Sequence, residues 1–312
     1  SFLCRQYRSC GDKFVCCDNN TFLSIKNLSL ISKNHPRGGF LFYNVDMEFF
    51  NLGLIFILGT IIGSFLNVVI YRLGTGFSIH KGRSRCFSCN KTLAWYELIP
   101  IVSFLLQKGR CKTCQARLSL QYPLVEFFTG VLFVFSAYIT TFDISQISLE
   151  TLITFCFYAV VSSLLVVLFV YDLKHKILPS SILYSFVIIS FVYTFFLYVG
   201  DERTAFDIFS GIILAAPIFI LWLVSKGKWI GFADGTLFLG VGFLLGFVMG
   251  IHAFLFSFWI GALVALILTY LLPRRFSFGS EIPFGPFIIL STLFFLFIQS
   301  DILGVSLFYD LF

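Results

Sequence analysis

The sequence predicts an all-α polytopic membrane protein with about eight transmembrane helices and a small loop domain between the first two helices. Of its 312 residues, 58% are hydrophobic and only 12% are charged, whereas a soluble domain carries about 25% charged residues. A polar insertion with four cysteines in two Cys-x-x-Cys pairs predicts the loop domain. In such a protein the distribution of basic residues between loops, more than the net charge of +6, indicates orientation, and we expect no nucleic-acid partner.

The predicted helices are runs of about 20 apolar residues, the length that spans a bilayer. The eight runs are Phe50–Arg72, Pro123–Thr141, Leu149–Tyr171, Ser181–Val199, Ala205–Val224, Thr236–Gly250, Ala253–Leu272 and Phe284–Ser300. The sixth run is short and rich in glycine, and only Ile251 and His252 separate it from the seventh. We therefore expect the first helix in 47–73, a soluble loop domain in 74–122 and a seven-helix membrane domain in 123–312.

Residues 1–46 do not fit this pattern, because they are polar, contain four cysteines and lack any run long enough to span. The first methionine is Met47, directly before the first predicted helix. We expect the segment to be disordered, or not natively translated.

The basic residues predict which ends of the helices face the cytoplasm. From Met47 onward, 15 of 16 lysines and arginines fall in alternate connections, and only Arg203 lies in the other set. The positive-inside rule makes the lysine- and arginine-rich side cytoplasmic. Asp172, which ends the third helix, and Asp234, which begins the sixth, then share the cytoplasmic face.

Glycines also recur at a spacing of four residues, at Gly59 and Gly63 and again at Gly242, Gly246 and Gly250. Such spacing is typical of helices that approach one another closely. We expect a packing role for these glycines.

Two aspartates beside membrane-length apolar runs suggest chemistry, because a carboxylate next to hydrocarbon is costly. Two carboxylates at one depth can share a proton and activate a water molecule, as in an aspartic protease. An aspartic peptidase with Asp172 and Asp234 as its catalytic pair is therefore the first hypothesis. The sequence does not indicate which would be the acid and which the base.

The loop cysteines have the pattern of a structural zinc site. Two knuckles, each a Cys-x-x-Cys pair, can complete a tetrahedral S4 centre, and 21 residues separate the pairs Cys86/Cys89 and Cys111/Cys114. Disulfides are the alternative, but the loop is predicted on the reducing side of the membrane. Cys156 lies alone within a predicted helix, and we expect it to be a small buried hydrophobe.

Several motifs together resemble the type IV prepilin peptidases, also called leader peptidase/N-methyltransferases. They are Gly63-Ser-Phe-Leu-Asn-Val-Val-Ile-Tyr-Arg72, the four-cysteine loop with Trp95-Tyr96 and Ile99-Pro100, Gly109-Arg110-Cys111, Tyr122-Pro123-Leu-Val-Glu126-Phe-Phe-Thr-Gly130, Asp172 with Leu178-Pro179, Gly231-Phe-Ala-Asp234 and Ile282-Pro-Phe-Gly-Pro286. The resemblance runs from about Met47 to the last helix and is specific to the bifunctional form with a tetracysteine loop.

The resemblance implies a multi-pass enzyme of the bacterial inner membrane, with its active site facing the cytoplasm. It would cut the leader of type IV prepilins or pseudopilins and then methylate the new N-terminus with S-adenosylmethionine. The resemblance carries the catalytic pair over to Asp172 and Asp234, and the zinc ligands to the four loop cysteines. In this family the loop is associated with methylation.

The chain departs from the family pattern near Asp234. The second glycine of Gly-x-Gly-Asp is Ala233, and the lysine two residues after the aspartate is Thr236. An alanine at positive φ would cost roughly 1 kcal/mol or more.

Other residues receive supporting roles. We expect Pro179 and Gly231 to shape the loops that bring the aspartates together, and Glu126 to contact substrate or cap a neighbouring helix. Asn67 and Arg72 are weak candidates for holding the methyl donor, since no glycine-rich nucleotide fingerprint occurs in a strand–helix context.

Three other functions remain open at this point. The protein could be a transporter that uses Asp172 and Asp234 as ion or proton sites, although such sites usually lie near the bilayer midplane. It could be a non-catalytic assembly protein of a pilus or secretion machine. Tyr171-Asp172 also resembles presenilin-type proteases, which lack a tetracysteine loop.

Overall fold

A computed structural model of the chain describes residues 39–75, 78, 82–142, 144, 147–200, 204–271 and 282–298. Within these residues the chain forms helices and irregular loops, with two isolated β-bridges. The helices are α2 (Gly39–Arg72), η1 (Trp95–Glu97), α3 (Val102–Leu106), α4 (Gln121–Ile139), α5 (Leu149–His175), α6 (Ser180–Val199), α7 (Ala205–Ser225), α8 (Phe232–Leu271) and α9 (Gly285–Ile298). The prediction of an all-α membrane protein is confirmed.

The chain divides into residues 1–47 and residues 48–312, and the elements below belong to the second unit. Six of the described helices are long and apolar enough to cross a membrane. Most of the predicted N-terminal extension (residues 1–38), together with Lys81, Arg203, Arg274 and Arg275, lies outside the described residues. The expected start at Met47 stays a prediction.

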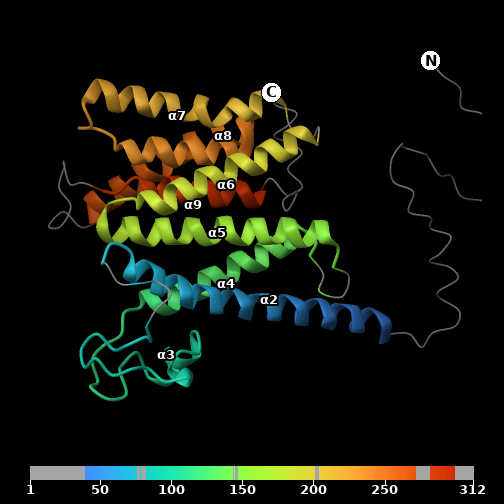
Figure 1. Cartoon of the computed structure of the whole chain (residues 1–312), viewed down its shortest axis with the longest axis vertical. Helices are drawn as coiled ribbons and strands as arrows, with labels where there is room; N and C mark the ends of the chain where they lie inside the picture. The colour runs from blue at the N-terminus through green and yellow to red at the C-terminus, as the bar shows by residue number, and fades with distance from the viewer. Residues whose placement is uncertain are drawn as a thin grey trace, which may run out of the picture. The chain divides into compact units, whose positions relative to one another are not determined.

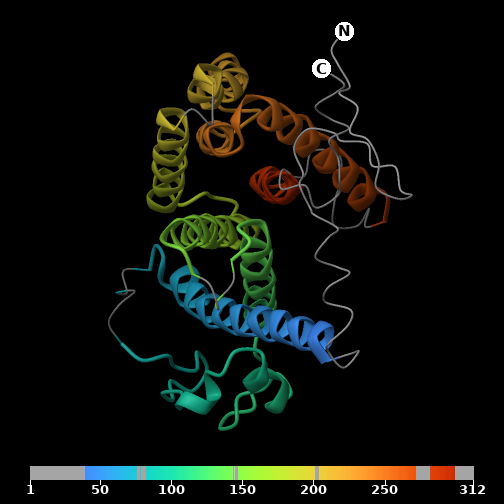
Figure 2. The ribbon, with the colours of Figure 1, turned by 90° about the vertical axis from the view of Figure 1, so that its right-hand side faces the viewer.

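The predicted boundary between the sixth and seventh helices is wrong in position. Helix α8 runs through Ile251 and His252, and its break lies at Gly246, where φ is 78° and ψ is −175°. Only glycine adopts this conformation readily. The turn therefore lies at Gly246 and not at the two-residue gap between the apolar runs. Figure 2 shows the two halves of α8 running in different directions. The first half is about 21 Å long at 1.5 Å per residue, too short to span alone.

The backbone groups released by the break have partners on neighbouring helices. The N–H of Phe247 donates to Oδ1 of Asp207 at 2.9 Å, and Ser210 Oγ donates to the carbonyl of Gly242 at 2.7 Å. The hydroxyl of Thr194 donates to the carbonyl of Phe243. A broken helix at membrane depth requires such internal partners, because lipid offers none.

The core of this unit lies where α5, α6, α8 and α9 meet (Figure 1). Its fully buried side chains include Leu165 of α5, Phe186 of α6, Phe238 of α8 and Ile289 of α9. Helix α8 packs against α6, α7 and α9, while α5 contacts α4, α6 and α9. A second cluster, with Ile70, Val125 and Val166, joins α2 and α4 to α5.

Close packing, as predicted, is the role of Gly59, Gly63 and Gly242, whereas Gly246 breaks the helix instead. A Cβ on Gly59 would lie 2.7 Å from the Cα of Gly130, and one on Gly63 would lie 2.8 Å from the Cα of Glu126. Helices α2 and α4 therefore touch backbone to backbone. This contact brings together the two helices between which the loop domain lies.

Candidate active site

Asp172 lies in the last turn of α5 and is only 5% exposed. Helix α5 starts at Ser148, whose Oγ accepts the N–H of Thr151 at 3.1 Å, and ends at Lys176, which adopts the left-handed conformation with φ 55°. These caps place the carboxylate at the end of the helix. A carboxylate at a helix C-terminus is unfavourable for the helix dipole, so helix stability does not account for its presence.

The first turn of α9 offsets the unfavourable interaction of the Asp172 carboxylate with the dipole of α5. The backbone N–H of Gly285, the first residue of α9, donates to the Asp172 carboxylate. A Cβ on Gly285 would overlap Oδ2 of Asp172 and would lie 3.5 Å from Leu178. The positive end of α9 therefore faces the carboxylate, and only glycine fits there.

Asp234 lies in the first turn of α8 and is partly exposed. Its Oδ2 accepts the N–H of Gly231 at 3.3 Å, and its own N–H donates to the carbonyl of Gly231 at 3.2 Å. This reciprocal pair starts the helix and orients the carboxylate. Asp172 is a charged neighbour of Asp234, and Leu178 and Ala233, which follow Asp172 and precede Asp234, pack on the same core. The ends of α5 and α8 therefore form one candidate site.

The site therefore holds two carboxylates from separate helices, each held by a glycine N–H. Within the described residues, neither carboxylate forms an ion pair. The carboxylates differ in access, because Asp172 is buried whereas Asp234 is partly exposed. Two carboxyl groups that interact electrostatically and have no cationic partner can hold one proton between them. One can then act as the acid and the other as the base.

The two departures near Asp234 do not distort this site. Ala233 lies inside α8 and is not among the residues with positive φ, so the strain considered for it does not arise. Thr236 is buried, and its hydroxyl donates to the carbonyl of Phe232 at 3.2 Å. The helix itself therefore satisfies the hydroxyl that stands in place of the family's lysine.

Pro179 and Gly231 both lie in connections at the ends of the helices that carry the aspartates. Pro179 is the N-cap of α6, with φ −68° and ψ 117°, in the turn that follows Asp172. Gly231 precedes α8 and supplies the N–H that binds Asp234.

Glu126 joins the loop domain to the membrane helices. Its Oε2 accepts the N–H of Ile101 at 2.7 Å, and Ile101 is the N-cap of α3. Ile101 has a positive φ of 59°, which is costly for a β-branched residue. Glu126 thus caps a neighbouring helix, one of the two roles expected for it.

Asn67 and Arg72 have different surroundings. Arg72 donates to the carbonyls of Ser78 at 2.7 Å and Gly82 at 3.3 Å, so it anchors the start of the loop. The side-chain nitrogen of Asn67 donates to the carbonyl of Tyr122 at 3.2 Å, while its Oδ1 is buried without a partner. Asn67 therefore has a buried acceptor without a protein partner, whereas Arg72 is engaged in holding the loop.

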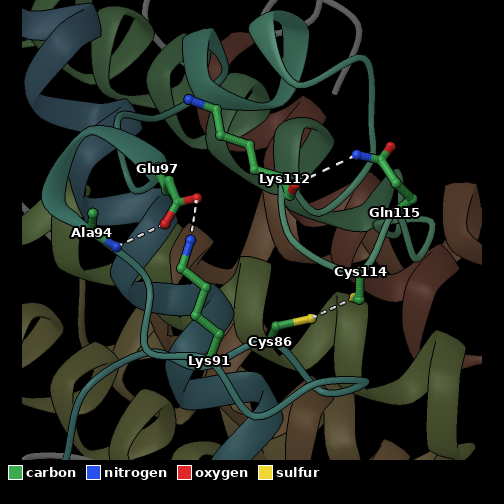
Figure 3. Close-up of polar contacts among 7 residues, drawn as sticks. All are labelled: Cys86, Lys91, Ala94, Glu97, Lys112, Cys114 and Gln115. Atoms are coloured by element: carbon green, nitrogen blue, oxygen red, sulfur yellow. Dashed lines mark hydrogen bonds and ion pairs between the residues drawn. The ribbon is translucent and has the colours of Figure 1, made fainter.

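The four loop cysteines converge on one point. Their sulfur atoms all lie within 4.8 Å of one another, and Cys86 Sγ lies 3.8 Å from Cys114 Sγ (Figure 3). Zn–S bonds of about 2.3 Å place tetrahedral sulfurs about 3.8 Å apart, so the cluster fits a metal ion of this kind. All four are free thiols, which argues against the disulfide alternative.

The two knuckles repeat one backbone pattern. The N–H of Cys86 donates to the carbonyl of Lys91, and the N–H of Cys111 donates to that of Ala116, both at 2.9 Å. Asn90 and Gln115 occupy the same left-handed position, with φ 56° and 57°. In the second knuckle, the N–H groups of Cys114 and Thr113 lower the pKa of the Cys111 thiol to about 6, whereas the pKa of Cys114 is raised to about 11, with burial and the neighbouring cysteines raising it. The knuckle therefore favours the metal-binding thiolate at Cys111.

Outside the cluster, one prediction about cysteine fails. Cys156 is exposed on α5, because in a membrane protein an apolar side chain can face lipid as readily as the core. No role was predicted for Gly285 from the sequence, although it lies in the Ile282–Pro286 motif of the family resemblance. A Gly-Pro pair at a predicted helix start was the available signal.

The fold and site together define a class of protein: a helical membrane protein with a carboxylate pair at one end of its helices and a tetracysteine module beside them. Two family profiles match the chain, the Bacterial Peptidase A24 N-terminal domain over residues 57–140 and the Type IV leader peptidase family over residues 159–266. The chain belongs to the type IV leader peptidase family and is an enzyme of that family.

Named relatives agree with this assignment. A prepilin leader peptidase/N-methyltransferase of Bacillus subtilis is 36% identical over 242 residues, which cover 75% of this chain and 89% of the relative. One from Vibrio cholerae is 30% identical over 261 residues, covering 78% of this chain and 96% of the relative. No solved structure shows significant similarity.

Proposed function

We propose that this protein is a membrane aspartic endopeptidase that cleaves the leader of type IV prepilins or pseudopilins, with Asp172 and Asp234 as its catalytic residues. The observation that carries the proposal is the convergence of the two carboxylates from α5 and α8, each bound by a glycine N–H. Family membership and the names of the relatives support the substrate class.

In the proposed reaction one carboxylate is ionised and takes a proton from water. The water oxygen attacks the scissile carbonyl carbon, and the other, protonated carboxyl donates its proton to the carbonyl oxygen. As the C–N bond breaks, the proton gained by the first carboxylate goes to the leaving amine, and a hydroxyl of the tetrahedral intermediate returns its proton to the second carboxylate. The glycine N–H donors hold both side chains in place throughout.

We also propose that the enzyme methylates the new N-terminus with S-adenosylmethionine, as the name of the relatives suggests. The methyl donor supplies an electrophilic methyl group, and this chain must bind it beside the cleaved terminus. Asn67 is the candidate contact, since its Oδ1 is buried without a protein partner. The proposed zinc is structural, because four protein ligands leave no open coordination position.

We place the enzyme in the bacterial inner membrane with its site facing the cytoplasm, on the lysine and arginine bias of the loops. The broken helix α8 is the feature that would favour a transporter. However, the backbone groups of Gly242, Phe243 and Phe247 have protein partners, so the break offers no vacant set of ligands. We therefore favour the peptidase over the transporter and over a non-catalytic assembly protein.

The test is cleavage of a prepilin in membranes that contain the protein or its Asp172→Asn or Asp234→Asn variant. Glu150→Gln is the matched control, because Glu150 lies exposed at the opposite end of α5. Each Asn variant should lose cleavage while remaining inserted, and Glu150→Gln should keep it. Reading the mature product by mass reveals the methyl group in the same experiment. Cleavage by either Asn variant would remove that residue from the mechanism.

A further inference from the structure

Part of the loop domain lies beside the candidate membrane span of α2, Phe50–Arg72, although the sequence predicted a soluble insertion. A groove of about 370 Å³ separates the loop from one face of α2, and its lining includes Ile61, Phe65 and Val68 of α2 and Trp95, Ile99 and Pro100 of the loop. Ile61 lies eleven residues before Arg72, about 16 Å along the helix axis. The hydrocarbon core is about 30 Å thick, so Ile61 lies about halfway along a span that ends at Arg72. The loop therefore contacts α2 well away from the Arg72 end.

Figures 1 and 2 both show the loop beside α2. The exposed side chains of this part of the loop suit lipid. Trp95 is 76% exposed, Leu105 67% and Leu106 78%. In water, neighbouring large apolar side chains with such exposure would be unfavourable.

The backbone of this segment is also suited to a medium without water. The N–H of Ile101 is bound by Glu126, and Ser103 and Leu105 donate to the carbonyls of Ile99 and Ile101 at 3.0 and 3.1 Å. Non-helical backbone at membrane depth requires internal partners of this kind. Glu126 thereby supplies an acceptor that lipid could not.

A basic groove of about 320 Å³ follows directly after α3, and its lining includes Lys108, Arg110 and Arg117 together with Phe104 and Leu120. Arg110 and Arg117 face each other across an antiparallel bridge, where like charges destabilise. Neither arginine has an acidic partner among the residues that the structure describes. Leu120 directly precedes α4, so this groove lies where a membrane helix begins. An anion bound between the arginines would relieve their repulsion.

We propose that residues 95–106 insert into the lipid leaflet at the Arg72 end of α2, and that Lys108, Arg110 and Arg117 bind the headgroup phosphate of an anionic phospholipid. The apolar segment and the basic groove are adjacent in sequence and match the two layers of a leaflet, hydrocarbon and phosphate. A free phosphate would match only the groove. The proposal does not depend on the peptidase chemistry, and none of its tests measures cleavage.

The first test measures the depth of Trp95 in the full chain reconstituted in lipid nanodiscs. A variant with Trp222, Trp229 and Trp259 replaced by phenylalanine reports on Trp95 alone. Lipids brominated on their acyl chains should quench its fluorescence, and aqueous iodide should not. A variant that keeps only Trp259, which is 76% exposed within α8, is the positive control for lipid contact. Quenching of Trp95 by iodide but not by brominated lipid would overturn the insertion.

The second test compares Arg110→Gln/Arg117→Gln with Arg83→Gln/Arg85→Gln, which removes the same charge from exposed positions elsewhere in the loop. Both variants and the parent are reconstituted in nanodiscs of phosphatidylglycerol and phosphatidylcholine, and retained lipid is measured by native mass spectrometry. The first variant should retain phosphatidylglycerol roughly 30-fold more weakly than the parent, while the second should retain it like the parent. Equal retention in both variants, or displacement of the lipid by excess inorganic phosphate, would overturn the headgroup site.

Discussion

Gly285 donates its backbone N–H to the carboxylate of Asp172 and leaves no space for a side chain between them. This contact makes the first turn of α9 part of the candidate active site. The buried carboxylate gains a donor and the positive end of a helix from one residue. Any side chain at position 285 must displace either Asp172 or α9.

Replacing Gly285 by alanine should therefore lower prepilin cleavage by about 100-fold, the effect of a catalytic group displaced by about 1 Å. The measurement is the initial rate of cleavage in membranes at equal protein level. Gly53→Ala is the control, because a Cβ there meets nothing within 4 Å. Unchanged cleavage by Gly285→Ala would show that the position of Asp172 does not depend on this contact.

Removal of one cysteine ligand should release the metal from the loop. We expect about one zinc per chain after mild purification, and its loss in Cys114→Ser, because three ligands hold the ion far less tightly. Metal analysis of the purified protein gives the answer directly. Cys156→Ser changes an exposed cysteine outside the cluster and should keep the zinc. Folded parent protein without metal would refute the zinc site.

The paired features could be located from the sequence, because each has a local signature. The apolar runs, the Cys-x-x-Cys pairs and the aspartates at the ends of apolar runs all follow from short-range chemistry. The turn was predicted at Ile251 and His252 instead of Gly246, because an apolar run indicates burial and does not determine the backbone conformation. The Gly285-Pro286 pair signals a helix start, but the contact of Gly285 with Asp172 and the role of Ile101 could not be predicted, because both depend on which distant helix end lies beside them.

The break itself offers a stability prediction. Gly246→Ala should destabilise the protein by about 1–3 kcal/mol, because a Cβ is strained at φ 78° and ψ −175°. Thermal unfolding in detergent, followed by circular dichroism, measures the change. Gly200→Ala, where a Cβ would meet only backbone oxygens at 3.6 Å, should unfold like the parent. A Gly246→Ala variant as stable as the parent would mean that α8 straightens at no cost.

The loop should also lose stability in acid through Glu97. The carboxylate of Glu97 accepts the N–H of Ala94 at 2.9 Å and the ammonium of Lys91 at 3.3 Å (Figure 3). These contacts hold the pKa of Glu97 below its ordinary value of 4.5, the Ala94 N–H having the largest effect. A lowered pKa stabilises the fold above pH 4.5, and this stabilisation is lost as pH falls through the folded value.

In the Glu97→Gln variant, the amide hydrogens of the loop should consequently exchange faster than in the parent at neutral pH. This difference in exchange rate should shrink as pH falls below 4.5. Hydrogen exchange of residues 91–98 at several pH values measures it, with rates corrected for intrinsic exchange. Glu150→Gln should follow the parent at every pH. A difference that grows in acid would have the wrong sign for this contact.

The loop and the helix that carries Asp172 meet at Tyr71. The Nζ of Lys174 lies 4.0 Å from the centroid of the Tyr71 ring, and Tyr71 stacks on Phe87 of the first knuckle with centroids 4.6 Å apart. Lys174 follows Asp172 by two residues, so this stack links the metal cluster to the end of α5. Stacking and cation–π contacts of this kind contribute about 0.5–2 kcal/mol.

Tyr71→Leu should therefore loosen the first knuckle and the last turn of α5 together. Hydrogen exchange should rise in residues 85–91 and in residues 172–176, while the half of α8 beyond Gly246 stays protected. Lys174→Met should affect the end of α5 more than the knuckle, because it removes the cation and leaves the Tyr71–Phe87 stack. Lys228→Met, at an exposed lysine in the α7–α8 connection, should leave both segments unchanged. If Tyr71→Leu loosened only the knuckle, the loop and the Asp172 end of α5 would be independent of each other.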